Sequence, residues 1–193
     1  MRLDNLCHSM RTDFSHNDSP GIERHVVLVA PEVHWNTGNA GRTCLGAGAV
    51  LHLVQPLGFR LDDKHVKRAG LDYWPKVPLR LWDDFNQFVT EMLPRKNEIV
   101  LLTKNGTRPY WQIPTLQRLF LIFGSETKGL SHSVLNRYPG RAYCIPISNQ
   151  IRCLNLSTAV GIVLYESLRP KHTALSIWHW LPSFYDVLSL TLM

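Results

Sequence analysis

The residues best suited to chemistry lie near the C-terminal end, between Ile145 and Glu166. Residues 145–154 form a polar, proline-containing loop, and residues 155–166 carry apolar side chains at the three- and four-residue spacing of one helix face. Asn155 or Ser157 can cap this helix, because their side-chain oxygens accept hydrogen bonds from free backbone N–H groups of the first turn. Such a loop suits a small ligand, although an ordinary well-capped strand-to-helix turn has the same features.

Two further polar loops follow apolar runs that predict strands. Pro31–Arg42 follows the run His25–Ala30, and Gly124–Leu130 follows the run Leu119–Gly124. In open α/β sheets, ligands bind at the carboxyl ends of the strands. We therefore expect the three loops to be able to build one site.

A phosphate-binding loop is the competing interpretation of a glycine-rich segment. GAGAVL, residues 46–51, begins like the dinucleotide-binding pattern GxGxxG, but it precedes a strand and lacks the third glycine. The chain also has no Walker-A sequence. Gly46 and Gly48 fit the end of a helix and a following turn better.

The elements that must position these loops alternate between strand and helix. Short apolar runs predict strands at His25–Ala30, Val50–Gln55, Leu79–Trp82, Glu98–Thr103, Leu119–Gly124 and Arg141–Ile145. Helices are predicted from Asn39 after a turn at Asn36–Gly38, at Asp62–Ala69, at 83–93 with Asp83 as cap and Pro94 as stop, at Ser131–Tyr138 and at Asn155–Leu168. Because the strands are apolar throughout, we expect an α/β fold with a mostly parallel sheet and helices on both faces.

Length and composition set the class of protein. The 193 residues, 45% hydrophobic and 19% charged, suffice for one domain with a sizeable core. A net charge of +6 is compatible with a nucleic-acid partner without proving one. The four cysteines form no CxxC pair and the nine histidines share no spacing, so we assign no metal site. So few cysteines favour a reducing compartment, and we expect a cytoplasmic protein.

The two ends of the chain differ from its middle. Residues 1–24 are polar, lack the apolar core of a signal peptide and contain three aspartates, so they predict a flexible N-terminal arm before a domain at 25–169. Residues 170–193 form an apolar and aromatic C-terminal extension, interrupted by Pro182 and Asp186 and too short in its apolar run to span a membrane. It could pack on the domain, cover a dimer surface or contact a partner.

Three motifs together carry a family resemblance. NTGNAGR (36–42), FGSETKGLS (123–131) and IPISNQIRCLNLSTAVGIVLYE (145–166) resemble the three motifs of the SpoU-type RNA 2′-O-methyltransferases of the SPOUT class. PLGFRLDDKHVKRAGLDYW (56–74) is most similar to the small tRNA methyltransferases that modify the ribose of the wobble nucleotide. The resemblance runs from about Val26 to Arg169.

This resemblance implies a fold and an activity. The fold would be the SPOUT fold with a C-terminal trefoil knot, the cofactor S-adenosyl-L-methionine (SAM), the substrate a cytidine or uridine at tRNA position 34, and the assembly a homodimer. The helix Asn155–Leu168 would contribute to the dimer, offering the apolar side chains of Val160, Val163, Leu164 and Tyr165. Alternatives are a ribosomal RNA 2′-O-methyltransferase and a catalytically inactive RNA-binding protein of the same fold.

The resemblance also assigns site residues. Those at polar positions near the reacting centre are Asn36, Arg42, Glu126 and Asn155. Those lining the cofactor pocket, mainly through backbone, are Leu102, Gly124, Gly129, Ile145, Cys153 and Leu154. A base role has been suggested for this arginine in the family. Because a guanidinium keeps its proton in proteins, we expect Arg42 to hold a substrate phosphate and to stabilise developing alkoxide charge instead.

Two departures from the family pattern are visible. Cys153 stands where serine is frequent, so a side-chain hydrogen bond there would be weaker. His34 and Trp35 replace a proline-rich pair before Asn36. Trp35 would either pack in the protein or stack on a substrate base.

Overall fold

The computed structural model describes residues 21–61 and 73–169. The predicted helix at Asp62–Ala69, the C-terminal extension and most of the N-terminal arm lie outside these ranges. The predicted α/β fold is confirmed for the described part of the chain, which forms a seven-stranded sheet.

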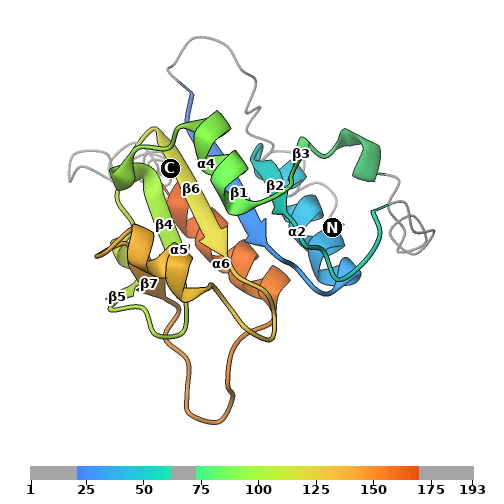
Figure 1. The fold of residues 1–193 in the computed structure, drawn as a ribbon. Coiled ribbons are helices and arrows are strands. Elements are labelled where there is room, and N and C mark those ends of the chain that lie inside the picture. Colours follow the sequence, from blue (N-terminus) through green and yellow to red (C-terminus); the bar gives the residue numbers. More distant parts are fainter. Residues whose placement is uncertain (1–20, 62–72, 170–193) are drawn as a thin grey trace, which may run out of the picture.

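All pairings in the sheet are parallel, and the strand order is β3-β2-β1-β6-β4-β7-β5 (Figure 1). The strands are β1 (Glu23–Val29), β2 (Val50–Val54), β3 (Leu79–Trp82), β4 (Ile99–Leu102), β5 (Arg108–Pro109), β6 (Arg118–Phe123) and β7 (Ala142–Cys144). The central strands β1, β4 and β6 are almost wholly buried, as their continuous apolar sequence predicts.

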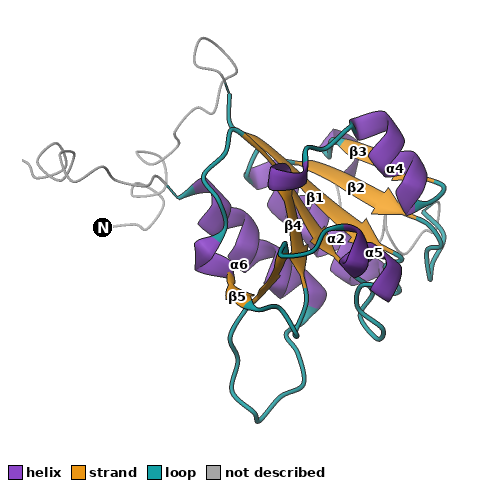
Figure 2. Ribbon diagram, turned by 60° about the vertical axis from the view of Figure 1, so that its left-hand side comes forward, coloured by secondary structure: helices purple, strands orange, loops and turns teal. Residues whose placement is uncertain are grey.

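Helices cover both faces of the sheet, as Figure 2 shows. One face packs against α2 (His34–Gly46) and α6 (Leu156–Leu168), and the other against α4 (Phe85–Met92) and α5 (His132–Arg137). Single 3₁₀ turns complete the described chain at η1 (Trp74–Lys76), η2 (Lys96–Glu98) and η3 (Tyr110–Gln112).

Most helix and strand boundaries differ from the predicted ones by one or two residues, and the clearest differences are in β1, α2 and the cap of α4. β1 begins at Glu23 rather than at His25. α2 begins at His34, not Asn39, so Asn36 lies inside the first turns of a helix rather than in a loop. Its N-cap residue makes no side-chain cap bond, which removes the usual signal for a helix start. The cap of α4 is Asp84 and not Asp83, because Asp84 accepts hydrogen bonds from two backbone N–H groups of the first turn.

The apolar face of α6 is used within the protomer. Val160, Val163 and Leu164 are all 0% exposed and belong to the core beneath α2 and α6. The expectation that they offer surface to a second subunit is therefore wrong. Tyr165, 56% exposed, is the residue of that set which faces outward.

The sheet order brings one strand between two others that are neighbours in sequence. β7 pairs with β4 on one side and with β5 on the other, although only residues 103–107 separate β4 from β5. This connection passes close to β7, because a Cβ on Gly106 would lie 2.2 Å from the carbonyl carbon of Tyr143. Gly106 is therefore sterically required where the two segments cross.

Candidate active site

The three polar loops meet at the carboxyl ends of β1, β6 and β7. The side-chain amide of Asn36 donates to Glu126 Oε1 at 2.9 Å, and the amide of Asn155 donates to Asn36 Oδ1 at 2.9 Å. The second carboxylate oxygen of Glu126 accepts the backbone N–H of Glu32 at 2.8 Å. We call Glu126, Asn36 and Asn155 the Asn36 network. It joins one residue from each of the three motifs.

Asn155 connects this network to a helix. Its Oδ1 accepts the backbone N–H of Ser157 at 2.9 Å and that of Thr158 at 3.4 Å, so Asn155 rather than Ser157 is the N-cap of α6. The same amide donates to Asn36 through its nitrogen. Both ends of the side chain are used, which fixes its orientation.

Glu126 is presented by a tight turn that depends on two glycines. The N–H of Gly129 donates to the carbonyl of Ser125 at 2.9 Å, and Gly129 has a φ of 68°, which favours glycine. A Cβ on Gly124 would lie 2.0 Å from the carbonyl carbon of Gly129. The two predicted glycine positions are thus required by the backbone itself.

Glu32 is a functional candidate that the sequence analysis missed. Its carboxylate accepts the hydroxyl of Thr127 at 2.6 Å, and this hydrogen bond lowers the pKa of Glu32 below its usual value. Its backbone N–H holds Glu126. The position of Glu32 directly after the first strand was the available signal, since polar side chains at that edge face the site.

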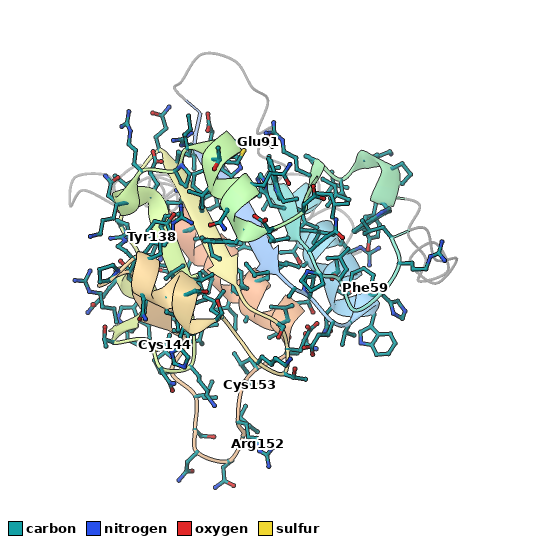
Figure 3. All side chains as sticks on the ribbon, in the orientation of Figure 1. Phe59, Glu91, Tyr138, Cys144, Arg152 and Cys153 are labelled. Carbon is teal, nitrogen blue, oxygen red and sulfur yellow. The ribbon has the colours of Figure 1, made fainter. Side chains whose placement is uncertain are left out.

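Three predicted cofactor positions, Ile145, Cys153 and Leu154, belong to the exposed loop between β7 and α6, and Leu102 lies on the strand beside β7. Leu102 ends β4 and is 8% exposed, Ile145 and Leu154 are half-buried at the two ends of the loop, and Cys153 is exposed. Figure 3 shows Arg152 near the tip and Cys153 on the arm that returns to α6. The loop projects from the body of the molecule in both ribbon views.

Arg42 lies on α2 outside the Asn36 network. Its side chain is exposed, and the guanidinium carbon lies 4.8 Å from the ring centroid of Tyr73. The hydroxyl of Tyr73 donates to the carbonyl of Gly38 at 3.2 Å, which ties η1 to α2. A Cβ on Gly41 would lie 2.6 Å from the Trp74 ring, so Gly41 permits this close packing. Arg42 therefore rests on a tyrosine from the stretch that carried the narrower resemblance.

Comparison with known protein families shows to which family this chain belongs. Residues 23–165 match the SpoU rRNA Methylase family. The chain belongs to this family. The resemblance drawn from the three motifs is thereby confirmed.

Relatives of this SpoU family member include proteins with stated activities. The tRNA (cytidine(34)-2′-O)-methyltransferase of Burkholderia cenocepacia is 40% identical over 146 residues, which cover 75% of this chain and 94% of the relative. A solved structure presented as "Structural insights into the 2-OH methylation of C/U34 on tRNA" is 42% identical with a TM-score of 0.71, covering 78% and 97% of the two chains. The AdoMet-bound rRNA methyltransferase of Sinorhizobium meliloti is 25% identical with a TM-score of 0.69, covering 78% and 57%.

Residues 21–61 and 73–169 contain no group of three or more His, Cys, Asp or Glu side chains that could hold a metal ion. Within the same ranges, every helix is too short or too polar to cross a membrane.

Proposed function

We propose that this protein is a SAM-dependent tRNA methyltransferase that methylates the ribose 2′-hydroxyl of the wobble nucleotide, cytidine or uridine 34. The observation that carries the proposal is the Asn36 network, which joins the three family motifs at one edge of the sheet. The relatives named for methylation of this nucleotide match three quarters of the chain.

The residues around the exposed loop fit the cofactor. A Cβ on Gly129 would meet nothing within 4 Å, so the backbone there is open to close approach, whereas the space beside Gly124 is filled by the backbone of Gly129. Ile145 and Leu154 offer partly exposed apolar surface. We assign the adenosine pocket to these residues together with Leu102 and Cys153. When bound, SAM supplies a methyl group already activated by its sulfonium, so the protein needs to align and stabilise rather than to activate.

The polar residues of the site have separate roles in positioning side chains and in binding the substrate. Both carboxylate oxygens of Glu126 already accept N–H groups, so Glu126 acts as a positioning residue that orients the amide of Asn36. Asn155 fixes the same amide from its other side. Arg42 is exposed and its guanidinium lies over the ring of Tyr73, which suits a bidentate contact with a substrate phosphate and stabilisation of charge on the 2′-oxygen.

The proposal includes the trefoil knot and the domain limits of the family. The placement of β7 between β4 and β5, beneath the connection at residues 103–107, supports a chain that threads through one of its own loops. Because β1 begins at Glu23 and Arg24 is buried, we assign the methyltransferase domain to residues 23–169 rather than 25–169, with the residues before it as an arm and 170–193 as an extension. We place the protein in the cytoplasm.

A two-fold homodimer is a further part of the proposal. Its support is the family resemblance and the outward-facing Tyr165 on α6, whose hydroxyl would lie 3.7 Å from a Cβ on Gly46 of α2. An isologous interface across α2 and α6 would cover this tyrosine in both subunits. Light scattering at micromolar concentration tests it, and a monomer would contradict it.

The activity is tested with purified protein, SAM and unmodified tRNA. We expect mass spectrometry of the digested tRNA to find 2′-O-methylcytidine or 2′-O-methyluridine from position 34. The matched substrate is the same tRNA with a 2′-deoxy nucleotide at position 34, which should accept no methyl group. Methylation elsewhere, or none with either substrate, would contradict the proposal.

A ribosomal RNA substrate is the second candidate, because the matching family is described by rRNA methylation. Parallel reactions with ribosomal RNA separate the two candidates. Methyl transfer to ribosomal RNA, with tRNA unmodified, would select the second.

A further inference from the structure

Three aromatic side chains gather where α2 begins. Trp35 is 58% exposed although tryptophan is usually covered. The ring of His34 lies 4.6 Å from that of Trp35 at an interplanar angle of 64°, and the ring of Phe59 lies 6.3 Å from that of His34. We call His34, Trp35 and Phe59 the Trp35 cluster. The exposure of Trp35 argues against packing as the reason for a tryptophan here.

The Trp35 cluster lies beside the proposed active site. Trp35 directly precedes Asn36, which is 4% exposed and bonded into the Asn36 network. Phe59 is brought close by the loop after β2, because the N–H of Gly58 donates to the carbonyl of Pro31 at 2.9 Å. Figure 3 shows Phe59 on the α2 side of the molecule. The cluster is thus fixed to the start of α2, which carries Asn36, and to the loop before it.

We propose that Trp35 is a stacking platform for an unpaired base next to the methylated nucleotide, an inference that rests on the proposed function. Single-stranded RNA loops are recognised by stacking of splayed bases on aromatic rings. His34 holds the indole edge-on from one side and leaves more than half of the tryptophan open. The exposed Arg42 and Arg60 supply positive charge for the phosphates of the same strand.

An RNA base fits the exposed side of Trp35 both in chemistry and in position. A base has a flat π-face that matches an exposed indole, and its backbone carries the charge that the nearby arginines complement. Because Trp35 directly precedes Asn36 in the chain, the bases expected beside it are those of the nucleotides that flank position 34. Trp35 would therefore set how the anticodon loop enters the site, and it is a positioning residue rather than a catalytic one.

The first test compares Trp35→Ala and Trp35→Phe in steady-state methylation of the tRNA. One stacked base is worth about 1–3 kcal/mol, so we expect Trp35→Ala to lower kcat/KM about ten- to a hundredfold, mainly through KM. Trp35→Phe should restore most of the loss, and SAM affinity should be unchanged in both. Trp111→Ala is the matched control, since Trp111 is 49% exposed on η3 and should behave as the parent.

The second test removes the base instead of the tryptophan. A tRNA with an abasic nucleotide beside position 34 should lose about as much kcat/KM with the parent as Trp35→Ala loses with intact tRNA. With Trp35→Ala the abasic nucleotide should cause little further loss, because both changes remove one interaction. Additive losses at each flanking position would overturn the proposal.

The outcomes separate this inference from the proposed function. A parent enzyme that methylates no RNA contradicts the proposed function, and binding of a labelled anticodon stem-loop to the parent and to Trp35→Ala still tests the platform. Equal activity or equal binding of the two proteins would overturn the platform. A change of oligomeric state in Trp35→Ala, measured by light scattering, would assign Trp35 to a protein contact and would also overturn it.

Discussion

Two hydrogen-bonded groups of polar side chains lie on this sheet, and their surroundings differ. The Asn36 network lies at the carboxyl edge, where Asn155 and the loop around it are exposed. The other group, which we call the His52 cluster, consists of His25, His52 and Trp82 and is buried beneath α4 among aromatic rings. One group is open to a ligand and the other is closed.

The His52 cluster has a defined direction of hydrogen bonding. The indole N–H of Trp82 donates to His52 Nδ1 at 3.0 Å, so the proton of His52 is on Nε2. His52 Nε2 lies 2.9 Å from His25 Nδ1 and donates to it. Both histidines are therefore neutral. Burial is the main cause that lowers the pKa of His25 to about 4 and that of His52 to about 3.

The comparison shows that burial, not the hydrogen bonds themselves, separates a stability element from a candidate active site. His52 is 0% exposed, and its bonds are satisfied inside the protein. The Asn36 network holds the half-buried Glu126 and the exposed Asn155 at an edge that a substrate can reach, with the buried Asn36 between them. Changes at the edge should lower activity, and changes in the His52 cluster should lower stability.

The largest effect is expected for Arg42→Ala. Loss of one preorganised donor to developing charge lowers the rate about a hundredfold or more, roughly 3 kcal/mol. SAM affinity should stay nearly unchanged, because Arg42 rests on Tyr73 and lies outside the proposed adenosine pocket. Single-turnover methyl transfer, measured beside SAM binding, checks both parts.

Arg42→Lys is the control for charge alone. An ammonium cannot reproduce the planar two-point contact of a guanidinium, so lysine should restore little of the rate. Near-parental transfer by Arg42→Ala would show that Arg42 has only a structural role.

The next effect concerns acid and the His52 cluster. Both folded-state pKa values lie below the ordinary value of 6.5, so the unfolded chain binds more protons at mildly acidic pH. The free energy of unfolding should be fully retained above about pH 6.5 and should fall as the pH drops towards 4 and 3. At pH 5 each histidine should account for about 2 kcal/mol of loss.

Urea unfolding between pH 7.5 and 5 measures this loss. His52→Gln removes one titrating group and should reduce the slope by about 1.4 kcal/mol per pH unit. His132→Gln, at an exposed position on α5, is the matched control for the substitution itself. Identical slopes in all three proteins would exclude the His52 cluster as the source.

A smaller effect is expected for Glu126→Gln. The glutamine oxygen can accept only one of the two N–H groups that Glu126 now holds, and its own NH₂ group would face the other donor. The amide of Asn36 loses its fixed orientation, so the rate should fall about tenfold, or roughly 1.4 kcal/mol. Since the turn at Gly124–Gly129 also borders the proposed pocket, SAM affinity should fall too, in contrast to Arg42→Ala.

Much of the fold and of the network was predictable because its signals are local. The continuous apolar runs marked the central strands, and glycine and polar residues after them marked the loops. Asn155 combined a cap residue with a following apolar helix, and it is the cap in the structure. The three motifs located three members of one hydrogen-bonded network before their contacts were known.

Some features could not be predicted because their local sequence signal is absent or occurs twice. Others depend on contacts between residues that are distant in sequence. Val33, the N-cap of α2, makes no side-chain cap bond, so the true helix start left no mark in the sequence. Asp83 and Asp84 have the same chemistry, and only the backbone geometry selects between them. His25, His52 and Trp82 are far apart in sequence, and pairing of three strands brings them together. The insertion of β7 between β4 and β5 is likewise set by the whole sheet.

The smallest effects separate helix capping from the Asn36 network. Asp84 Oδ1 accepts the N–H groups of Asn86 and Gln87 at 2.7 and 2.8 Å, as Asn155 does for its own helix. Asp84→Ala should lower the free energy of unfolding by about 1 kcal/mol and leave methyl transfer unchanged. Asp83→Ala should cost less stability than Asp84→Ala and also leave methyl transfer unchanged, because Asp83 is not the cap and accepts only an exposed hydrogen bond from Gln55 at 3.3 Å.

Asn155→Asp is the matching change at the edge of the sheet. Aspartate keeps the oxygen that caps α6 but lacks the amide that donates to Asn36 Oδ1, so it places two acceptors against each other. Asn36 cannot turn its amide to compensate, because its nitrogen is already bonded to Glu126. We therefore expect a stability close to that of the parent, measured by thermal unfolding, together with slower single-turnover methyl transfer. If Asn155→Asp transfers methyl groups at the parental rate, Asn155 is a helix cap like Asp84, and the Asn36 network has no part in positioning the substrate.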